Sequence, residues 1–290
     1  MFIDIHGHTF SFRDPRSRKL TSFVSPEELL ARWPELEVEQ AVLLPLVHHE
    51  CLNVLQTNED ILDICARFPG KFIPFCNLDP RFHHNNDKVD FGPTLAHYKE
   101  MGCRGVGEMC ANLWWDDPRV LNMLSHIERA RLPLLFHVGV DGGTYGLVDE
   151  PGLPKLELVL ERFPDLNFIG HSMAFWSAIS GDITPENWMA YPKGPVTEGG
   201  RLVELLRRYP NLYCDISAGS GNNALTRDHE FGYWFMEEFQ DRVLYGSDLC
   251  WPDQQVPQSA TLKKALAEGK ISRTVFDKIG RGNAERLLGL

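Results

Sequence analysis

The sequence predicts an α/β protein built as a single-domain (β/α)8 TIM barrel. Short apolar runs alternate with longer amphipathic segments along the whole chain. Parallel strands need long crossover connections, usually helices, so this alternation predicts a parallel sheet. Eight such units in 290 residues fit a barrel. No glycine-rich phosphate loop follows the first run, which argues against a dinucleotide-binding sheet.

The eight apolar runs are the expected strands, and each is short enough to cross a barrel wall once. In chain order they are Phe2–His6, Gln40–Leu46, Lys71–Asn77, Cys103–Gly107, Leu134–His137, Asn167–Gly170, Leu212–Ile216 and Arg242–Tyr245.

Capping residues mark the helices between these runs. Ser25-Pro26-Glu27-Glu28 is a capping box with proline at the first helical position, and Thr57-Asn58-Glu59-Asp60 opens the next helix. Asp117-Pro118 begins a helix that we expect to run to about Arg131. The other expected helices are Leu95–Met101, Leu156–Phe163, Arg201–Tyr209, Phe231–Phe239 and Thr261–Glu268.

One segment is too long for a simple connection. Residues 172–200 follow the sixth strand and are rich in Trp, Pro and Gly. Long loops in compact domains are usually lids or binding loops, so we expect a lid-like insertion here. No linker or change of composition divides the chain, and we expect one domain over residues 1–290.

Composition narrows the class of partner. The net charge of −11 argues against nucleic acid and against an anionic membrane surface, because both are bound through positive charge. Seven cysteines without a CxxC pair indicate reduced thiols rather than a disulfide framework. No leader-like segment opens the chain, so we expect a cytoplasmic protein that acts on a small molecule. The composition is also compatible with a homo-oligomer.

The most informative motif is His6-Gly7-His8, at the end of the first predicted strand. Side chains at i and i+2 of a strand point the same way, so both imidazoles share one face, together with Asp4. Imidazole is the commonest metal ligand, and two on one rigid element make half of a tetrahedral site.

Similar side chains follow other predicted strands. Barrel active sites lie at the carboxyl ends of the strands, so we expect these residues to meet. They are Glu108 after the fourth strand, His137 in the fifth, His171 after the sixth and Asp248 after the eighth.

These motifs resemble the amidohydrolase superfamily, and within it the family 2 branch of enzymes similar to aminocarboxymuconate semialdehyde decarboxylase. The matching segments span the chain: Ile3–His8, Phe136-His137, Phe168–His171, Tyr245–Asp248 and Gly282–Gly289.

The resemblance implies a divalent metal bound by His6, His8, His137 and Asp248. It makes His171 the residue that transfers a proton or polarises the substrate, and Asp248 the general base. Zinc is the expected ion, and Mn²⁺ or Fe²⁺ would accept the same ligands. Asp4 either accepts a hydrogen bond from a ligand histidine or serves an interior role, and Asp215 has the same two alternatives.

Glu108 decides the number of ions. Members of the resembled family with one metal commonly lack a carboxylate after strand four, whereas binuclear relatives place a bridging carboxylate there. We expect one ion, with two if Glu108 bridges; the alternative is that Glu108 bonds to backbone or to an arginine.

Substrate contacts are expected from the first loop and from tryptophans. Arg13 is the preferred of several basic residues that could grip a carboxylate, the alternative being a solvated loop. Aromatic walls suit a small-molecule pocket, and the expected wall residues are Trp114, Trp115, Trp176 and Trp251. His48 and His49 either contact substrate or form a surface pair.

The sequence therefore predicts a metal-dependent hydrolase of a small amide, ester or lactone. The first alternative is a non-oxidative decarboxylase of a small unsaturated or aromatic acid. A non-catalytic metal-binding barrel and a TatD-like nuclease are weaker alternatives, and the acidic balance disfavours the nuclease.

Overall fold

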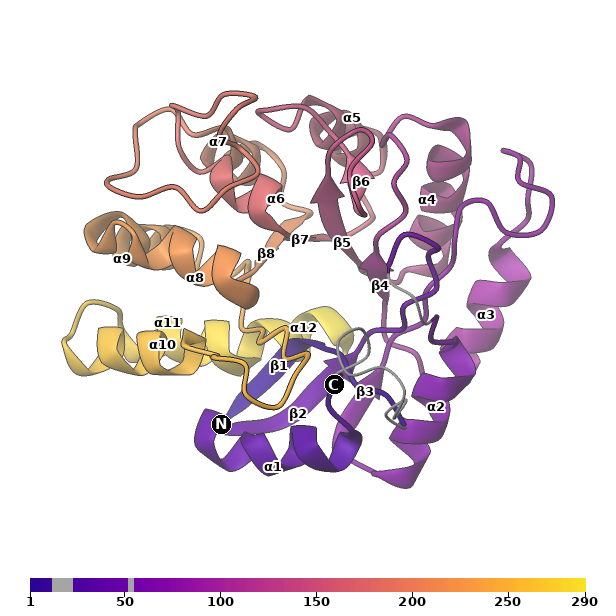
Figure 1. Cartoon of the computed structure of the whole chain (residues 1–290), viewed down its shortest axis with the longest axis horizontal. Coiled ribbons are helices and arrows are strands. Elements are labelled where there is room, and N and C mark those ends of the chain that lie inside the picture. The colour runs from indigo at the N-terminus through magenta and orange to yellow at the C-terminus, as the bar shows by residue number, and fades with distance from the viewer. Residues whose placement is uncertain (12–22, 52–54) are drawn as a thin grey trace.

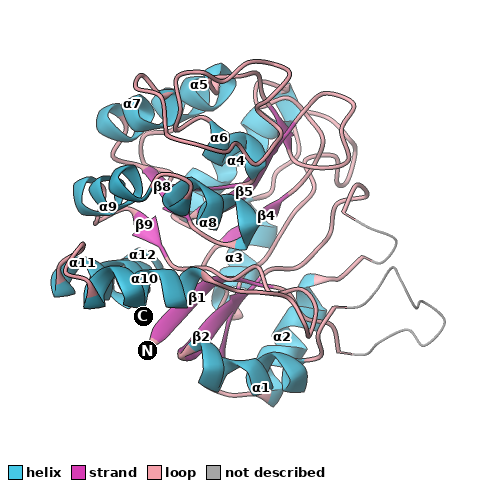
Figure 2. Ribbon diagram, turned by 60° about the vertical axis from the view of Figure 1, so that its left-hand side comes forward, coloured by secondary structure: helices cyan, strands magenta, loops and turns pink. Residues whose placement is uncertain are grey.

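Strands at the centre and helices around them make up the fold of this computed structural model, which describes residues 1–11, 23–51 and 55–290 (Figures 1 and 2). The strands are β1 (Phe2–Gly7), β2 (Val38–Leu43), β3 (Phe72–Pro74), β4 (Val106–Met109), β5 (Leu134–Gly139), β6 (Leu147–Val148), β7 (Phe168–His171), β8 (Leu212–Asp215) and β9 (Val243–Leu244). Eight of them coincide with the predicted runs, and β6 is a short addition that pairs with β5.

All strand pairs are parallel, as predicted, but the strands form two sheets rather than one continuous ladder. One sheet has the order β1-β2-β3 and the other β4-β5-β7-β8-β9. Backbone hydrogen bonds cross both gaps. Gly107 N donates to Cys76 O over 2.9 Å between β3 and β4, and Ile5 N donates to Tyr245 O over 2.9 Å between β1 and the end of β9. The strand order is therefore that of a barrel, with two weak seams.

The helices follow one another around the outside of the strands (Figure 1). The capping predictions are confirmed: Ser25 and Thr57 both form capping boxes, and Asp117 caps its helix. The helices are α1 (Pro26–Leu36), α2 (Asn58–Arg67), α3 (Gly92–Glu100), α4 (Pro118–Ala130), α5 (Pro154–Arg162), α6 (Met173–Ser177), α7 (Arg201–Arg208), α8 (Ala218–Thr226), α9 (His229–Glu238), α10 (Gln258–Ala267), α11 (Arg273–Asp277), the π-helical turn η1 (Lys278–Gly282) and α12 (Asn283–Leu288).

Two apolar clusters hold these layers together. The larger lies between strands and helices and includes Phe2, Phe136 and Phe168. The smaller consists mainly of strand residues of the opposite parity, such as Ile3, Ile5 and Leu135, with Ala284 and Leu288 of α12. Strand alternation separates the two sets, so the space inside the strands is a packed core, and the chemistry is confined to the strand ends.

Candidate metal centre

Polar side chains from five strands meet at the carboxyl ends of the barrel. Each is carried by the last residues of a strand or by the residues directly after it, so the sheet fixes their positions. They are His6 and His8 of the first strand, Glu108 in β4, His171 in β7, Asp215 in β8 and Asp248 after β9. Apart from Asp248, all of these side chains are buried.

The tautomers of His6 and His8 follow from their hydrogen bonds. His6 Nδ1 lies 2.6 Å from the carboxylate of Asp215, and His8 Nδ1 lies 3.2 Å from the carbonyl oxygen of Leu44. Both partners are acceptors, so both Nδ1 atoms donate. Each Nε2 atom is then left with a lone pair, and the two Nε2 atoms are only 3.1 Å apart. Two facing lone pairs repel unless a proton or a cation lies between them.

Two carboxylates complete this arrangement. Glu108 Oε2 lies 3.4 Å from the Nε2 atoms of both His6 and His8. Asp248 Oδ1 lies 3.6 Å from His6 Nε2 and 3.7 Å from His8 Nε2. In a tetrahedral zinc site with bonds of 2.0–2.2 Å, ligand atoms lie roughly 3.3–3.6 Å apart. Each carboxylate oxygen therefore lies at a ligand-like distance from the pair of histidine Nε2 atoms.

The electrostatics favour a cation at the same place. Burial lowers the pKa of His6, but nearby negative charges raise it by more, to well above its ordinary value; they belong to Asp248, Glu108 and Asp215. Burial raises the pKa of Glu108, while the charge of His6 and hydrogen bonds from histidine rings lower it by more, to well below its ordinary value. Three carboxylates thus surround the His6 ring and favour positive charge there, which a metal ion would supply instead.

The carboxylate of Asp215 orients two histidines through one short network. Besides accepting from His6, Asp215 Oδ2 accepts the hydroxyl proton of Ser217 over 2.8 Å. Ser217 Oγ then accepts from His171 Nδ1 over 2.9 Å, which leaves His171 Nε2 as an acceptor. That Nε2 atom lies 3.8 Å from Asp248 Oδ2.

Comparison with models of protein families identifies the family of this chain. The model of the amidohydrolase family, the amidohydrolase-2 type, matches residues 3–290. The chain belongs to this family. The resemblance drawn from the sequence is thereby confirmed, and the family is typically metal-dependent.

Solved structures agree on the fold of this amidohydrolase. An uncharacterised TIM-barrel protein from Bordetella bronchiseptica is 18% identical with a TM-score of 0.67, covering 99% of this chain and 98% of its own. A probable 2-pyrone-4,6-dicarboxylic acid hydrolase from Acinetobacter baumannii is 16% identical with a TM-score of 0.59, covering 100% and 99%. The 5-carboxyvanillate decarboxylase from Sphingomonas paucimobilis is 16% identical with a TM-score of 0.61, also covering 100% and 99%. A search of curated proteins gives no match.

His137 lies beside the candidate metal ligands of this amidohydrolase. Among the described residues, two groups bring their ligand atoms within 4.8 Å of one another: His6, His8 and Asp248, and His6, Glu108 and His171. His137 Nδ1 instead contacts Glu108 Oε1 over 2.9 Å. The structure thus places both predicted ligands, His137 and Glu108, side by side at the cavity.

The backbone holds Asp248 in an unusual conformation. Its φ of 51° lies in the left-handed region, which aspartate tolerates better than most residues. Asp248 N donates to His6 O over 2.9 Å, and the Gln254 side chain donates to Asp248 O over 2.5 Å. These bonds aim the carboxylate at the histidines across the seam between β1 and β9.

A cavity of about 220 Å³ opens above this cluster. Its floor is formed by metal-capable side chains, and its wall by aromatic, apolar and thiol groups. No arginine or lysine among the described residues lines it. The wall residues are Phe23, Leu46, Cys51, Cys110, Tyr145, Cys250 and Trp251.

Of the four predicted wall tryptophans, the structure places only Trp251 at the cavity. Trp115 is fully buried and packs against Phe136, with ring centroids 4.9 Å apart. Trp176 is buried and donates its indole N–H to Asp215 O over 2.9 Å. Trp114 lies under the ammonium group of Lys155. None of these three lines the cavity: Trp115 and Trp176 pack inward, whereas Trp114 is half-buried against Lys155. Arg13 lies outside the described residues.

Sequence reasoning left other features open that the structure resolves. Asp4 does not touch a histidine ring: it accepts from the backbone N–H groups of His6 and Ser247, so its role is interior. Asp215 is the carboxylate that accepts the hydrogen bond from His6. Of the pair His48 and His49, the first is buried outside the cavity wall and the second is exposed. The contribution of Ser217 had no sequence signal beyond its place after a strand.

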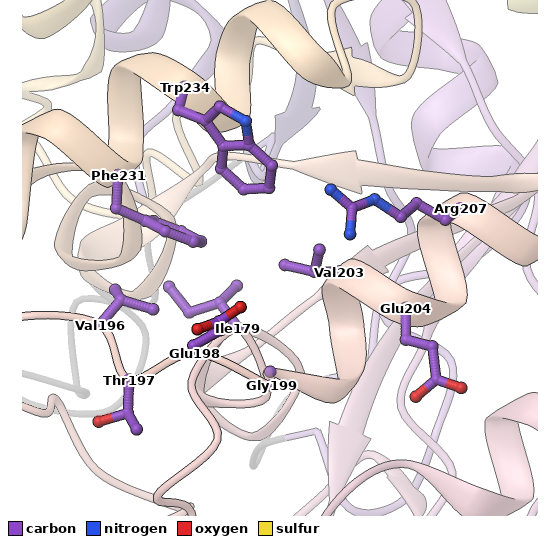
Figure 3. A pocket seen from close by; sticks show the side chains of 11 residues that line it. Ile179, Val196, Thr197, Glu198, Gly199, Val203, Glu204, Arg207, Phe231 and Trp234 are labelled. Atoms are coloured by element: carbon purple, nitrogen blue, oxygen red, sulfur yellow. The ribbon is translucent and has the colours of Figure 1, made fainter.

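A second, larger hollow of about 510 Å³ lies between residues 179–200 and helices α7 and α9 (Figure 3). Val203, Phe231 and Trp234 form its apolar side, with Arg207 and Glu204 at one edge (Figure 3). Among the described residues, no cluster of candidate metal ligands lines this hollow. The predicted lid segment thus borders this hollow, whereas none of residues 172–200 lines the cavity above the histidines. No helix of the described chain is long and apolar enough to cross a membrane.

Proposed function

We propose that this amidohydrolase is a hydrolase of a small amide, ester or lactone that works with one divalent ion, zinc by preference. The observation that carries the proposal is the approach of two carboxylates to the facing Nε2 atoms of two histidines. The proposed ligands are His6, His8, Glu108 and Asp248, with His137 held against Glu108. A bound zinc ion would polarise the substrate carbonyl and lower the pKa of a water molecule.

Proton transfer is assigned to Asp248 and His171. Asp248 directs Oδ1 toward the histidine pair and Oδ2 toward His171 Nε2. Asp248 is thus placed to take a proton from the attacking water. His171 Nε2 carries a lone pair, because its Nδ1 proton is engaged by Ser217, so it can accept that proton and return it to the leaving group.

The cavity limits the substrate to a small molecule. Its volume of about 220 Å³ lies below the range of roughly 300–1,000 Å³ that is typical of drug-sized ligands. Aromatic rings at its wall would stack on a flat substrate, while the polar groups lie together at the floor. A flat ester, lactone or amide with its carbonyl at the floor fits this division.

A second candidate is the decarboxylation of a small aromatic acid. The aromatic wall favours it, because Phe23, Tyr145 and Trp251 could hold a planar ring whose carboxylate faces the floor. Among the similar folds, one protein is named as a hydrolase and another as a decarboxylase, so both reactions occur on this architecture.

The test is a panel of small lactones, esters, amides and aromatic acids, assayed with the zinc-loaded protein for hydrolysis and for carbon dioxide release. We expect hydrolysis of at least one lactone, ester or amide, with turnover lowered roughly 10²–10⁴-fold by Asp248→Asn and by His171→Ala. Asp253→Asn, an exposed carboxylate on the same loop, is the control and should retain turnover. Carbon dioxide release without hydrolysis would favour the second candidate. Turnover unchanged in both active-site variants would reject catalysis at this site.

A further inference from the structure

Three of the seven cysteines line the cavity, and two of them form a pair. Cys51 lies in the loop after β2, and Cys110 directly follows β4. Both are nearly fully buried, both are free, and they pack in one cluster with Leu46. Both line the wall of the same cavity, so the two thiols lie near each other without being bonded. The third thiol, Cys250, instead donates to Asp248 Oδ1 over 3.3 Å.

His48 holds the two cysteines in place from behind. Its carbonyl oxygen accepts the N–H of Cys51 over 3.0 Å, and its Nδ1 accepts the N–H of Cys110 over 3.3 Å. His48 Nε2 then donates to Leu78 O over 3.3 Å, which makes the ring a neutral bridge. One buried residue therefore fixes the backbones that carry both thiols, although β2 and β4 belong to different sheets.

We propose that Cys51 and Cys110 form a reversible disulfide on reaction with a small hydroperoxide that enters the cavity. The Cys51 thiolate attacks one peroxide oxygen, the O–O bond breaks, and an alcohol or water leaves once protonated. The Cys110 sulfur then attacks the resulting sulfenic acid, the S–S bond forms, and water leaves with the thiol proton. Two thiols are oxidised to one disulfide while one hydroperoxide is reduced.

The surroundings assign the attacking role to Cys51. The neighbouring thiol of Cys110 lowers the pKa of Cys51 to about 7, against the opposing effect of burial. The thiolate is the reactive form, so Cys51 is available near neutral pH. The disulfide would join the loop after β2 to the strand end that carries Glu108. Glu108 belongs to the floor of the cavity.

The experiment uses the reduced full-length protein, treated with hydrogen peroxide and then denatured for thiol counting. We expect the count to fall from seven to five per chain, with dithiothreitol restoring all seven. Cleavage after Glu and Arg should release residues 51–59 joined to residues 109–119 and lighter by two hydrogen atoms than the separate peptides. This readout needs no substrate, so its failure is distinct from failure of the proposed function.

Variants separate the roles of the two thiols. Cys51→Ser should keep all of its thiols under the same treatment, whereas Cys110→Ser should stop at a sulfenic acid on Cys51 that dimedone traps. Cys65→Ser, a half-buried thiol on α2 away from the cavity, is the matched control and should still form the link. Seven thiols surviving in the wild type, or a link between other cysteines, would overturn the proposal, and this wild-type result does not depend on how the variants fold.

Discussion

His6 Nδ1 and Asp215 Oδ2 lie 2.6 Å apart, although 209 positions separate the two residues in the chain. The contact exists because β1 and β8 both end at the same rim of the barrel. It directs the lone pair of His6 Nε2 toward His8, Glu108 and Asp248. One hydrogen bond therefore links the fold to the donor geometry on which the proposed chemistry depends.

Replacing Asp215 by asparagine should weaken metal binding more than it weakens the fold. The asparagine amide can donate toward His6 Nδ1. This would favour the tautomer of His6 that carries its proton on Nε2 and so has no lone pair there. Losing such an outer partner typically costs 10–100-fold in metal affinity. Competition with a zinc chelator measures the change.

Asp149→Asn is the control for that prediction, since Asp149 is another buried carboxylate that accepts only backbone N–H groups at the start of α5. It should lower stability and leave zinc affinity unchanged. Equal losses of affinity in both variants would show that Asp215 acts only through general stability.

Metal content should be one zinc per chain, and removing it should abolish turnover. His6 belongs to both groups of candidate ligand atoms, so a second ion would have to share it. Elemental analysis of the purified protein and its dialysis against a chelator measure this directly. Two equivalents, with the second lost in Glu108→Gln, would instead make Glu108 a bridge.

As the pH rises from about 4 to about 6, the free energy of unfolding should fall because of Asp149. Burial raises its pKa to about 6 from an ordinary value of 3.8. In this interval the folded state holds a proton that the unfolded state releases, so raising the pH favours unfolding. The contribution lost is about 1.4 kcal/mol per pH unit at most, and about 3 kcal/mol in all.

Urea unfolding of the wild type and Asp149→Asn across this pH range measures the effect. The free energy of unfolding of the wild type, measured relative to that of Asp149→Asn, should fall by about that amount as the pH rises. A difference in the free energy of unfolding that is independent of pH would contradict the assignment of the raised pKa to this carboxyl.

Two tryptophans should respond in opposite ways to truncation. Trp251 is 48% exposed at the cavity, so Trp251→Ala should raise KM several-fold with little loss of stability. Trp115 is buried in the larger core cluster, so Trp115→Ala should cost about 3–5 kcal/mol in the free energy of unfolding. Michaelis constants and denaturant midpoints distinguish the two outcomes, and a stability loss in Trp251→Ala equal to that of Trp115→Ala would contradict them.

The sequence by itself determined the order of strands and helices and the strand ends that carry His6, His8, Glu108, His171 and Asp248. These features depend on local signals: capping residues, apolar periodicity and the rule that barrel chemistry lies at the carboxyl ends of strands. Because such signals act over a few residues, they can be read without the fold.

Only the tertiary structure decided which of these side chains touch. The parity of β1 suggested Asp4 as the brace of a histidine, but the register of β1 shifts between Asp4 and Gly7, and Asp215 from β8 takes that place. Likewise, the inward packing of Trp115 and the meeting of Cys51 with Cys110 depend on loop paths. Contacts between strand ends are set by register and packing across the barrel, which no local pattern encodes.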